Sequence, residues 1–329
     1  MKSLVLGCCR ASSLGGEAMD TINEKSKPYV ASHTLEISLK KAEIKQISGI
    51  IYEQVSCHGY PNMPMTLDLL QPQQEGPRPL VIFLTGGGFI FSNRDNGVQL
   101  RYYLAERGYA VASVTYRVTP GTQFPGPLED VKGAVRYLRS HAERWNLDAT
   151  RIALVGASAG GYLASFAGIT NGVARFDKGE NLQVKSDVSC AVSLYGPSDL
   201  SKAAEDYREE IQAFHRSEGS LQSLFVNGIP QIGGSPGGLQ ANPERAAAAN
   251  PLCYISKKSS PILLMHGSED LEVSPSQTDL LFQALRSQGI PSERYVIPGA
   301  GHGGAYWVQD EVLRVIESFI SQYLEKRTV

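Results

Sequence analysis

One serine of this chain stands in a pentapeptide of small residues that suits nucleophilic chemistry. Gly156-Ala157-Ser158-Ala159-Gly160 directly follows the apolar run at residues 152–155, which places the serine at the tip of a predicted strand-to-helix turn. Such a turn lifts a hydroxyl clear of its sheet, and its strained backbone leaves room only for small neighbours. The same pattern also suits close packing or phosphate binding. Ser158 is therefore a candidate nucleophile whose assignment depends on other residues.

A serine hydroxyl is a weak nucleophile near neutral pH, so a base and a group that orients this base are also needed. Of the six histidines, His302 is the best candidate, because it lies in Gly301-His302-Gly303 just after the apolar run at residues 295–297. A glycine-rich loop at the carboxyl end of a strand can present a base to a neighbouring turn. The alternative is an ordinary surface-loop histidine.

The orienting carboxylate is expected on another loop that follows a strand. Asp270 is our choice, because it comes shortly after the apolar run at residues 262–265. Glu269 and Glu272 are neighbouring rivals, and Asp199, after an earlier predicted strand, is a more distant one. Each of these acids could instead be a turn or helix-capping residue.

A run of glycines supplies the fourth element of this chemistry. Gly86, Gly87 and Gly88 directly follow the apolar run at residues 80–84. Their backbone amides can point at the oxygen that becomes negative when Ser158 attacks a carbonyl, and the amide of Ala159 would add another donor. The alternative is a flexible turn.

Regular alternation of strands and helices would position these residues. Apolar residues at 128, 131, 135 and 138 predict an amphipathic helix between two of the strands. Strands buried on both faces and joined by helices form a mostly parallel, doubly wound α/β sheet, whose ligands gather at the carboxyl ends of its strands. The predicted parallel strands cover residues 80–84, 110–114, 152–155, 188–194 and 262–265, and a preceding hairpin or adjacent pair covers 47–55 and 65–70.

The chain divides into an N-terminal arm at residues 1–45 and a catalytic domain at residues 46–329. Residues 200–260 break the strand-helix rhythm: a charged, helix-prone stretch precedes a Gly- and Pro-rich one and a short alanine-rich helix. A connection of this length in a compact domain is usually functional. We expect a cap beside the site, and the alternative is a solvated excursion without substrate contact.

Composition excludes several classes of partner. With 31 Lys and Arg against 33 Asp and Glu, the chain has no basic field for nucleic acid or anionic lipid. Five scattered cysteines predict neither a disulfide framework nor a zinc site and favour a reducing compartment. The start at residues 1–8 faintly resembles a lipoprotein signal but is too short, and no run approaches a membrane span. These observations predict a soluble, cytoplasmic protein with small-molecule partners, unless translation starts upstream; a homodimer is left open.

From about Met65 to its C-terminus, the chain resembles an α/β-hydrolase of the esterase/lipase group, close to hormone-sensitive-lipase-like and acetyl-xylan/feruloyl-esterase-like carboxylesterases. The order Ser158, Asp270, His302 is that of the α/β-hydrolases. Four motifs carry the resemblance: the run Gly86, Gly87 and Gly88; Gly156-Ala157-Ser158-Ala159-Gly160; His266-Gly267 followed by Asp270 and Val273; and Gly301-His302-Gly303.

The resemblance implies a role for each of these residues. Ser158 is the implied nucleophile, His302 the general base and then acid, and Asp270 the orienting group, with Gly86, Gly87 and Ala159 as amide donors. Where the family's oxyanion motif usually opens with histidine, this chain has Thr85. The donor pair, Gly86 with Gly87 or Gly87 with Gly88, is therefore left open. Arg117 also matches the group and is expected to pair with an acid and hold loops near the site.

The sequence and the resemblance together predict a serine ester hydrolase that works through an acyl-enzyme on small acyl or aryl esters, without metal or cofactor. An acyltransferase or an amidase or peptidase could use the same triad. From a different class, the alternative is a non-catalytic binding protein with a hydrolase fold. Candidates for the wall of the substrate pocket are Gly88, Phe89, Tyr195, Phe214, Phe225 and Tyr306.

Overall fold

The structure is a computed structural model that describes residues 32–57 and 59–325. Most of the expected N-terminal arm, including the signal-like start at residues 1–8, lies outside the described residues. Residues 32–40 belong to a separate N-terminal unit and contain no helix or strand. The unit that begins at Lys41 contains all the helices and strands of the described chain.

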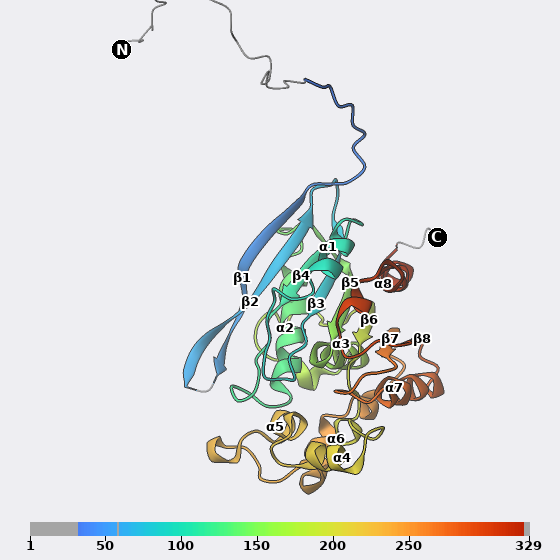
Figure 1. Ribbon diagram of the computed structural model, residues 1–329. Helices are drawn as coiled ribbons and strands as arrows, with labels where there is room; N and C mark the ends of the chain where they lie inside the picture. Colours follow the sequence, from blue (N-terminus) through green and yellow to red (C-terminus); the bar gives the residue numbers. More distant parts are fainter. Residues whose placement is uncertain (1–31, 58, 326–329) are drawn as a thin grey trace, which may run out of the picture. The chain divides into compact units, whose positions relative to one another are not determined.

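A single eight-stranded sheet, in the order β1-β2-β4-β3-β5-β6-β7-β8, organises this unit (Figure 1). The pairs β1–β2 and β2–β4 are antiparallel, and all other neighbours are parallel. The chain therefore has the mostly parallel α/β sheet that the sequence predicts. The strands are β1 (Ile44–Cys57), β2 (Tyr60–Pro72), β3 (Arg78–Leu84), β4 (Ala110–Val114), β5 (Leu147–Ala157), β6 (Cys190–Leu194), β7 (Ile262–Gly267) and β8 (Ser292–Ile297).

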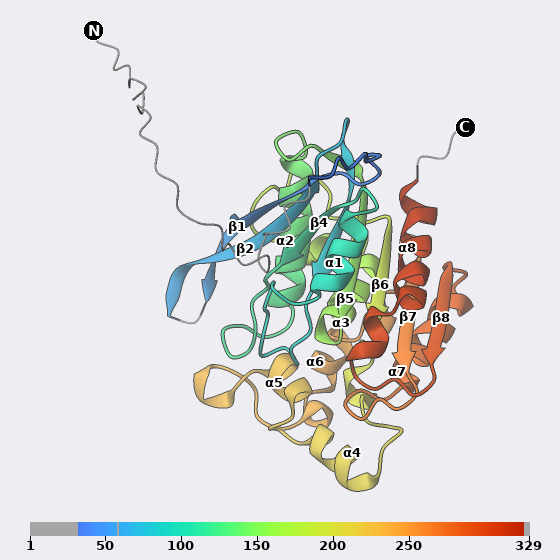
Figure 2. The same cartoon turned by 45° about the horizontal axis from the view of Figure 1, so that its top comes forward.

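Helices cover both faces of the sheet (Figure 2). The helices α1 (Val98–Ala105) and α8 (Asp310–Leu324) pack on one face. The helices α2 (Gly126–Ser140), α3 (Ala159–Ile169) and α7 (Ser276–Ser287) pack on the other. The strands β4, β6 and β7 are buried along their whole length, because apolar side chains on both of their faces meet helices.

The antiparallel strands β1 and β2 are longer than the sequence predicts. The ladder between β2 and β4 covers only Leu67 to Leu70, whereas β1 and β2 pair with each other as far as Cys57 and Tyr60. The far half of this hairpin thus has no third strand beside it, and the exposed Tyr60 lies there. At β6 the difference is small: the strand begins at Cys190, because the backbone amide of Val188 donates to the side chain of Asn171 instead.

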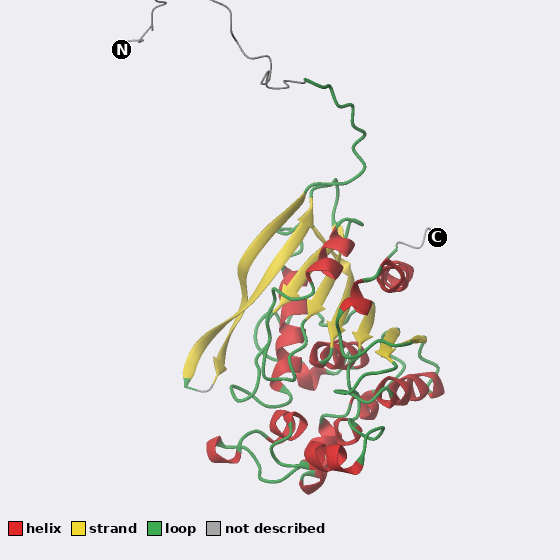
Figure 3. Ribbon diagram, viewed as in Figure 1, coloured by secondary structure: helices red, strands yellow, loops and turns green. Residues whose placement is uncertain are grey.

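The segment at residues 200–260 forms short helices gathered at one end of the sheet (Figure 3). They are α4 (Glu209–Arg216), α5 (Leu221–Asn227) and α6 (Pro243–Ala248). Helix α4 contains no buried residue, whereas α5 buries Phe225 and Val226. The 3-10 turns of the described chain are η1 (Ala174–Phe176), η2 (Leu200–Lys202), η3 (Pro230–Ile232), η4 (Leu239–Ala241), η5 (Pro251–Tyr254) and η6 (Ala305–Val308).

Two further features concern partners and compartment. In residues 32–57 and 59–325, no helix is both long and apolar enough to cross a membrane. Cys57, Cys190 and Cys253 are free thiols.

Candidate active site

Ser158 occupies the sharp turn between β5 and α3. Its backbone has φ 54° and ψ −121°, a conformation that is strained for any residue with a side chain. The flanking glycines are required by space: a Cβ on Gly156 would lie 2.0 Å from the carbonyl oxygen of Gly160, and one on Gly160 would lie 2.1 Å from that of Leu84. The small residues of the pentapeptide therefore let α3 start directly against the sheet.

His302 lies between Ser158 and Asp270. Its Nε2 atom is 2.8 Å from Ser158 Oγ, and its Nδ1 atom is 2.7 Å from Asp270 Oδ2. The loop after β8 carries this imidazole, and the ring of Tyr195 packs edge-on against it with a centroid distance of 4.8 Å. These contacts favour the neutral tautomer in which Nδ1–H donates to Asp270 and Nε2 accepts the hydroxyl proton of Ser158.

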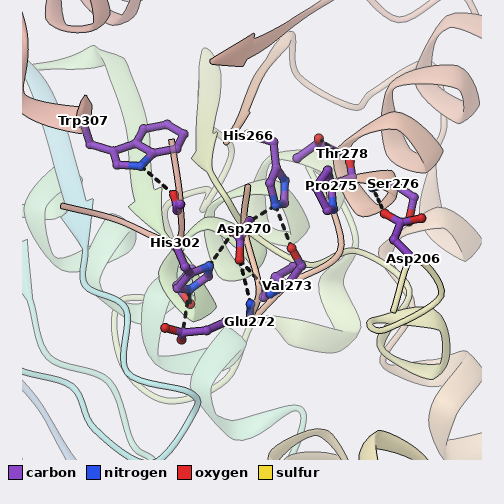
Figure 4. Close-up of polar contacts among 12 residues, drawn as sticks. Asp206, His266, Asp270, Glu272, Val273, Pro275, Ser276, Thr278, His302 and Trp307 are labelled. Carbon is purple, nitrogen blue, oxygen red and sulfur yellow. Dashed lines mark hydrogen bonds and ion pairs between the residues drawn. The ribbon is translucent and has the colours of Figure 1, made fainter. Parts of the chain in front are cut away.

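Asp270 is buried behind His302, in the loop that follows β7 (Figure 4). Its Oδ1 atom accepts hydrogen bonds from the backbone amides of Glu272, at 2.9 Å, and Val273, at 3.0 Å. Burial by itself would raise the pKa of Asp270, but hydrogen bonds from His266, His302 and Val273 and the attraction of His302 outweigh it. The pKa therefore lies well below its usual range, and the carboxylate is ionised at neutral pH.

His266 is a second histidine on the same carboxylate. Its Nε2 atom lies 3.1 Å from Asp270 Oδ2 and 3.0 Å from the carbonyl oxygen of Val273, and its ring is fully buried. Figure 4 shows His266 and His302 on different sides of Asp270. In the sequence, His266 is recognised only as part of a family motif. Its spacing of four residues before Asp270, at the end of a buried strand, is the signal that could have indicated this contact.

The rival acids have other positions. Asp199 accepts a hydrogen bond from the backbone amide of Ser201 and so caps η2. Glu269 is exposed and makes no ion pair with His302 in the described chain. The carboxylate of Glu272 lies 3.8 Å from His302 Nε2, but its side chain is 72% exposed. Asp270 is therefore the acid whose hydrogen bond fixes the imidazole.

The glycine loop after β3 packs against the serine turn. A Cβ on Gly86 would lie 2.9 Å from the carbonyl oxygen of Ala157 and 3.0 Å from Ser158 Cβ. Gly87 has φ 148°, and a Cβ there would lie 2.4 Å from the carbonyl oxygen of Phe91. Within the described residues, the backbone amides of Gly86, Gly87 and Ala159 donate no hydrogen bond. They are available to a ligand oxygen beside Ser158.

Two side chains support this loop from behind. Thr85 is buried, and its hydroxyl donates to the carbonyl oxygen of Gly86 at 2.7 Å. The hydroxyl of Tyr116 donates to the carbonyl oxygen of Thr85, also at 2.7 Å. The threonine that replaces the family's histidine thus bonds to the neighbouring backbone. The resemblance gives the segment of Tyr116 and Arg117 a structural role, but this particular bond was not predicted, because it joins residues far apart in the sequence.

Arg117 behaves as expected from the sequence. Its guanidinium binds the buried carboxylate of Asp130 through Nε and Nη2, the latter at 2.7 Å, and its backbone amide donates to the same carboxylate. This pair connects the loop after β4 to α2.

Two cavities meet at Ser158. The first, the loop-side cavity, has a volume of about 480 Å³ and is walled by Phe83, Ile90 and Phe91. The second, the insertion-side cavity, has a volume of about 310 Å³ and is walled by Phe89, Phe214 and Leu271. Five residues line both: Gly88, Ser158, Leu221, Glu272 and His302. A carbonyl group beside Ser158 could therefore extend a substituent into each cavity.

Only some of the residues that the sequence predicts for the pocket wall line these cavities. Gly88 lines both, Tyr195 lines the loop-side cavity, and Phe89 lines the insertion-side cavity. Phe225 lines neither, because it is fully buried and stacked on Phe89 with a centroid distance of 4.0 Å. Tyr306 also lines neither; it is half exposed, and its hydroxyl faces Gly299. Leu221, Phe83 and Leu271 are wall residues that sequence reasoning missed.

Comparison with known proteins identifies a family model and several curated proteins that are similar to this chain. A family model described as BD-FAE matches residues 67–285. Among curated proteins, the chain is 28% identical to esterase LipC of Mycobacterium tuberculosis over 69% of this chain and 53% of that protein. It is 27% identical to isoprenylcysteine alpha-carbonyl methylesterase ICME of Arabidopsis thaliana, over 77% of this chain and 59% of that protein. The chain thus spans little more than half the length of these relatives.

Among solved structures, a truncated carbohydrate esterase from gut microbiota superposes with a TM-score of 0.74 at 22% identity, covering 88% of this chain and 99% of that one. This likeness identifies the fold as that of the α/β-hydrolases.

Proposed function

Because the chain belongs to the BD-FAE family, we propose that it is a serine carboxylic ester hydrolase. The observation that carries the proposal is the continuous hydrogen-bonded path from Ser158 Oγ through His302 to Asp270. The serine at the start of this path has a strained backbone and lies beside unpaired backbone amides. The esterases among its relatives support the same reaction class.

In the proposed reaction, Ser158 Oγ attacks the ester carbonyl while His302 Nε2 takes the hydroxyl proton. The imidazolium that forms is stabilised by the ionised carboxylate of Asp270. The carbonyl oxygen becomes negative and accepts hydrogen bonds from the backbone amides of Ala159 and the glycine loop. Each such hydrogen bond typically lowers the barrier by roughly 3 kcal/mol. The C–O bond then breaks, and His302 gives its proton to the departing alcohol.

A water molecule completes the cycle. His302 Nε2 takes a proton from this water as its oxygen attacks the acyl-enzyme carbonyl. The second tetrahedral intermediate collapses, the bond to Ser158 Oγ breaks, and the serine recovers its proton from His302. The products are a carboxylic acid and an alcohol.

We assign substrate selection to the cap at residues 200–260, within a catalytic domain at residues 46–329. The support is that Phe214 and Leu221, both from this segment, line the insertion-side cavity. Cavities of about 480 and 310 Å³ suit small acyl or aryl esters. The free thiols of Cys57, Cys190 and Cys253 favour the cytoplasm as the compartment. A homodimer stays a prediction that size-exclusion chromatography tests.

The decisive experiment is a panel of nitrophenyl esters of graded acyl length, with aryl amides and acetylated sugars, assayed with the wild-type protein and Ser158→Ala. We expect ester turnover that falls by at least roughly a thousandfold in the variant. A fluorophosphonate probe should label Ser158 in the folded wild-type protein, as read by peptide mass spectrometry. Turnover that is independent of Ser158 would defeat the proposal, and product analysis with competing alcohols would detect acyl transfer.

A further inference from the structure

The two cavities beside Ser158 share one charged side chain. Among the described residues that line them, Glu272 is the only aspartate, glutamate, lysine or arginine. The other walls are apolar residues, glycines and neutral polar groups. Neither cavity is therefore lined by a lysine or arginine that could bind a carboxylate or phosphate of a substrate.

Glu272 lies beside the triad residues through its backbone and its side chain. Its amide donates to the buried carboxylate of Asp270, and its own carboxylate lies 3.8 Å from His302 Nε2. In the described part of the chain, no lysine or arginine lies within 4.0 Å of this carboxylate. No lysine or arginine of the described chain therefore compensates the negative charge that Glu272 brings to the junction of the two cavities.

Two titratable residues that line the cavities are neutral and add no positive charge. Burial, followed by the charges of Asp270 and Glu272, raises the pKa of Tyr195, which lines the loop-side cavity, to about 12. On the insertion side, burial lowers the pKa of His215, so this wall residue is neutral at neutral pH. Neither Tyr195 nor His215 therefore offsets the charge of Glu272, and His302, whose Nε2 atom lies 3.8 Å from its carboxylate, offsets it only when protonated.

We infer that Glu272 selects substrates by charge, so that the site accepts neutral and cationic esters and disfavours esters with an anionic group near the reacting carbonyl. This inference rests on the proposed ester hydrolysis and narrows its substrate class. An anion in either cavity is repelled by Glu272, whereas a cation in the same place is attracted. Because the side chain is largely exposed, the interaction is screened by water and salt.

The test uses three aryl esters whose acyl chains have the same length and similar bulk but end in trimethylammonium, tert-butyl or carboxylate. We expect the wild-type kcat/KM to be highest for the cation and lowest for the anion, with a ratio of roughly tenfold at low salt. Glu272→Gln should bring the ratio to within about twofold, and 0.5 M NaCl should reduce it in the wild-type protein. Glu272→Lys should reverse the order.

The matched control is Glu269→Gln, which removes the same charge from an exposed residue of the same loop that lines neither cavity. It should keep the wild-type ratio. Circular dichroism of each variant checks that it is folded.

Failure of the inference is distinguishable from failure of the proposed function. If the tert-butyl ester is hydrolysed in a Ser158-dependent way but the ratio is near one, or unchanged in Glu272→Gln, the charge selection is wrong and the hydrolase stands. An equal loss of kcat/KM for all three esters in Glu272→Gln would show that Glu272 acts through His302 and not by selecting substrates. This result would overturn the inference. If the wild-type protein hydrolyses none of them, both proposals fall.

Discussion

The strand-end loops and helix α4 of the insertion at residues 200–260 both line the cavities at Ser158, but they are packed in opposite ways. On the sheet side, Ser158 is held at a strained φ, and Gly86 has no room for a methyl group. On the insertion side, α4 contains no buried residue, and the ring of Phe214 is 60% exposed.

The difference separates two tasks. The reacting atoms need positions fixed to within a few tenths of an ångström, which close packing against a sheet provides. The cavity wall needs only shape and charge, so a loosely packed helix such as α4 can supply part of it. Substitutions on the sheet side are therefore expected to change turnover, and those on the insertion side are expected to change which ester binds.

The largest expected effect is that of Asp270→Asn. The amide cannot supply the negative charge that stabilises the imidazolium of His302, and it no longer enforces the required tautomer. We expect kcat for a nitrophenyl ester to fall by roughly 10³- to 10⁴-fold. Asp199→Asn should have almost no effect, because Asp199 only caps η2. The reverse result would move the orienting acid to the earlier loop.

The next largest effect is expected at a glycine on the sheet side, and a glycine of the insertion serves as its control. A methyl group at Gly86 would meet the carbonyl oxygen of Ala157 and Ser158 Cβ, so Gly86→Ala should displace the amide donors and lower kcat by roughly 10- to 100-fold. Gly219 lies in the insertion, where a Cβ has open space around it. Gly219→Ala should therefore leave kcat within about twofold of the wild-type value. Equal effects in steady-state kinetics would refute the contrast between the regions.

A smaller effect is expected when the support behind the glycine loop is removed. Tyr116→Phe deletes the hydroxyl that donates to Thr85 but keeps the buried ring. We expect kcat to fall roughly threefold to tenfold with KM nearly unchanged, since a hydrogen bond of this kind contributes about 1 kcal/mol. A change in KM alone would instead indicate that Tyr116 acts on substrate binding.

The smallest effect is expected on the insertion side. Phe214→Ala removes an exposed ring that lines the insertion-side cavity. KM should rise roughly twofold to fivefold for esters large enough to fill this cavity, with little change for acetate esters. The melting temperature should stay within about 2 °C of the wild-type value, because little packing is lost. A large drop in stability would show that the insertion is as tightly integrated as the sheet.

Local sequence patterns explain which parts of the fold and the site could be predicted. The strand at residues 110–114 was predicted with its observed bounds, because a short apolar run between turn signals leaves few alternatives. Ser158, Asp270 and His302 could be placed at one edge because parallel strands end together. Side-chain contacts of distant residues carry no local signal, which is why the burial of Phe225 and the bond of Tyr116 to Thr85 were not foreseen.

The order of the site residues along the chain has a consequence for synthesis. Ser158 and His302 are 144 positions apart, and their hydrogen bond requires β5, β6, β7 and β8 to be paired in register. A ribosome therefore completes the serine turn well before it adds the loop that carries His302. With the proposed roles, the serine of a nascent chain has no general base until β8 joins the sheet, and turnover during refolding begins only after β8 has docked.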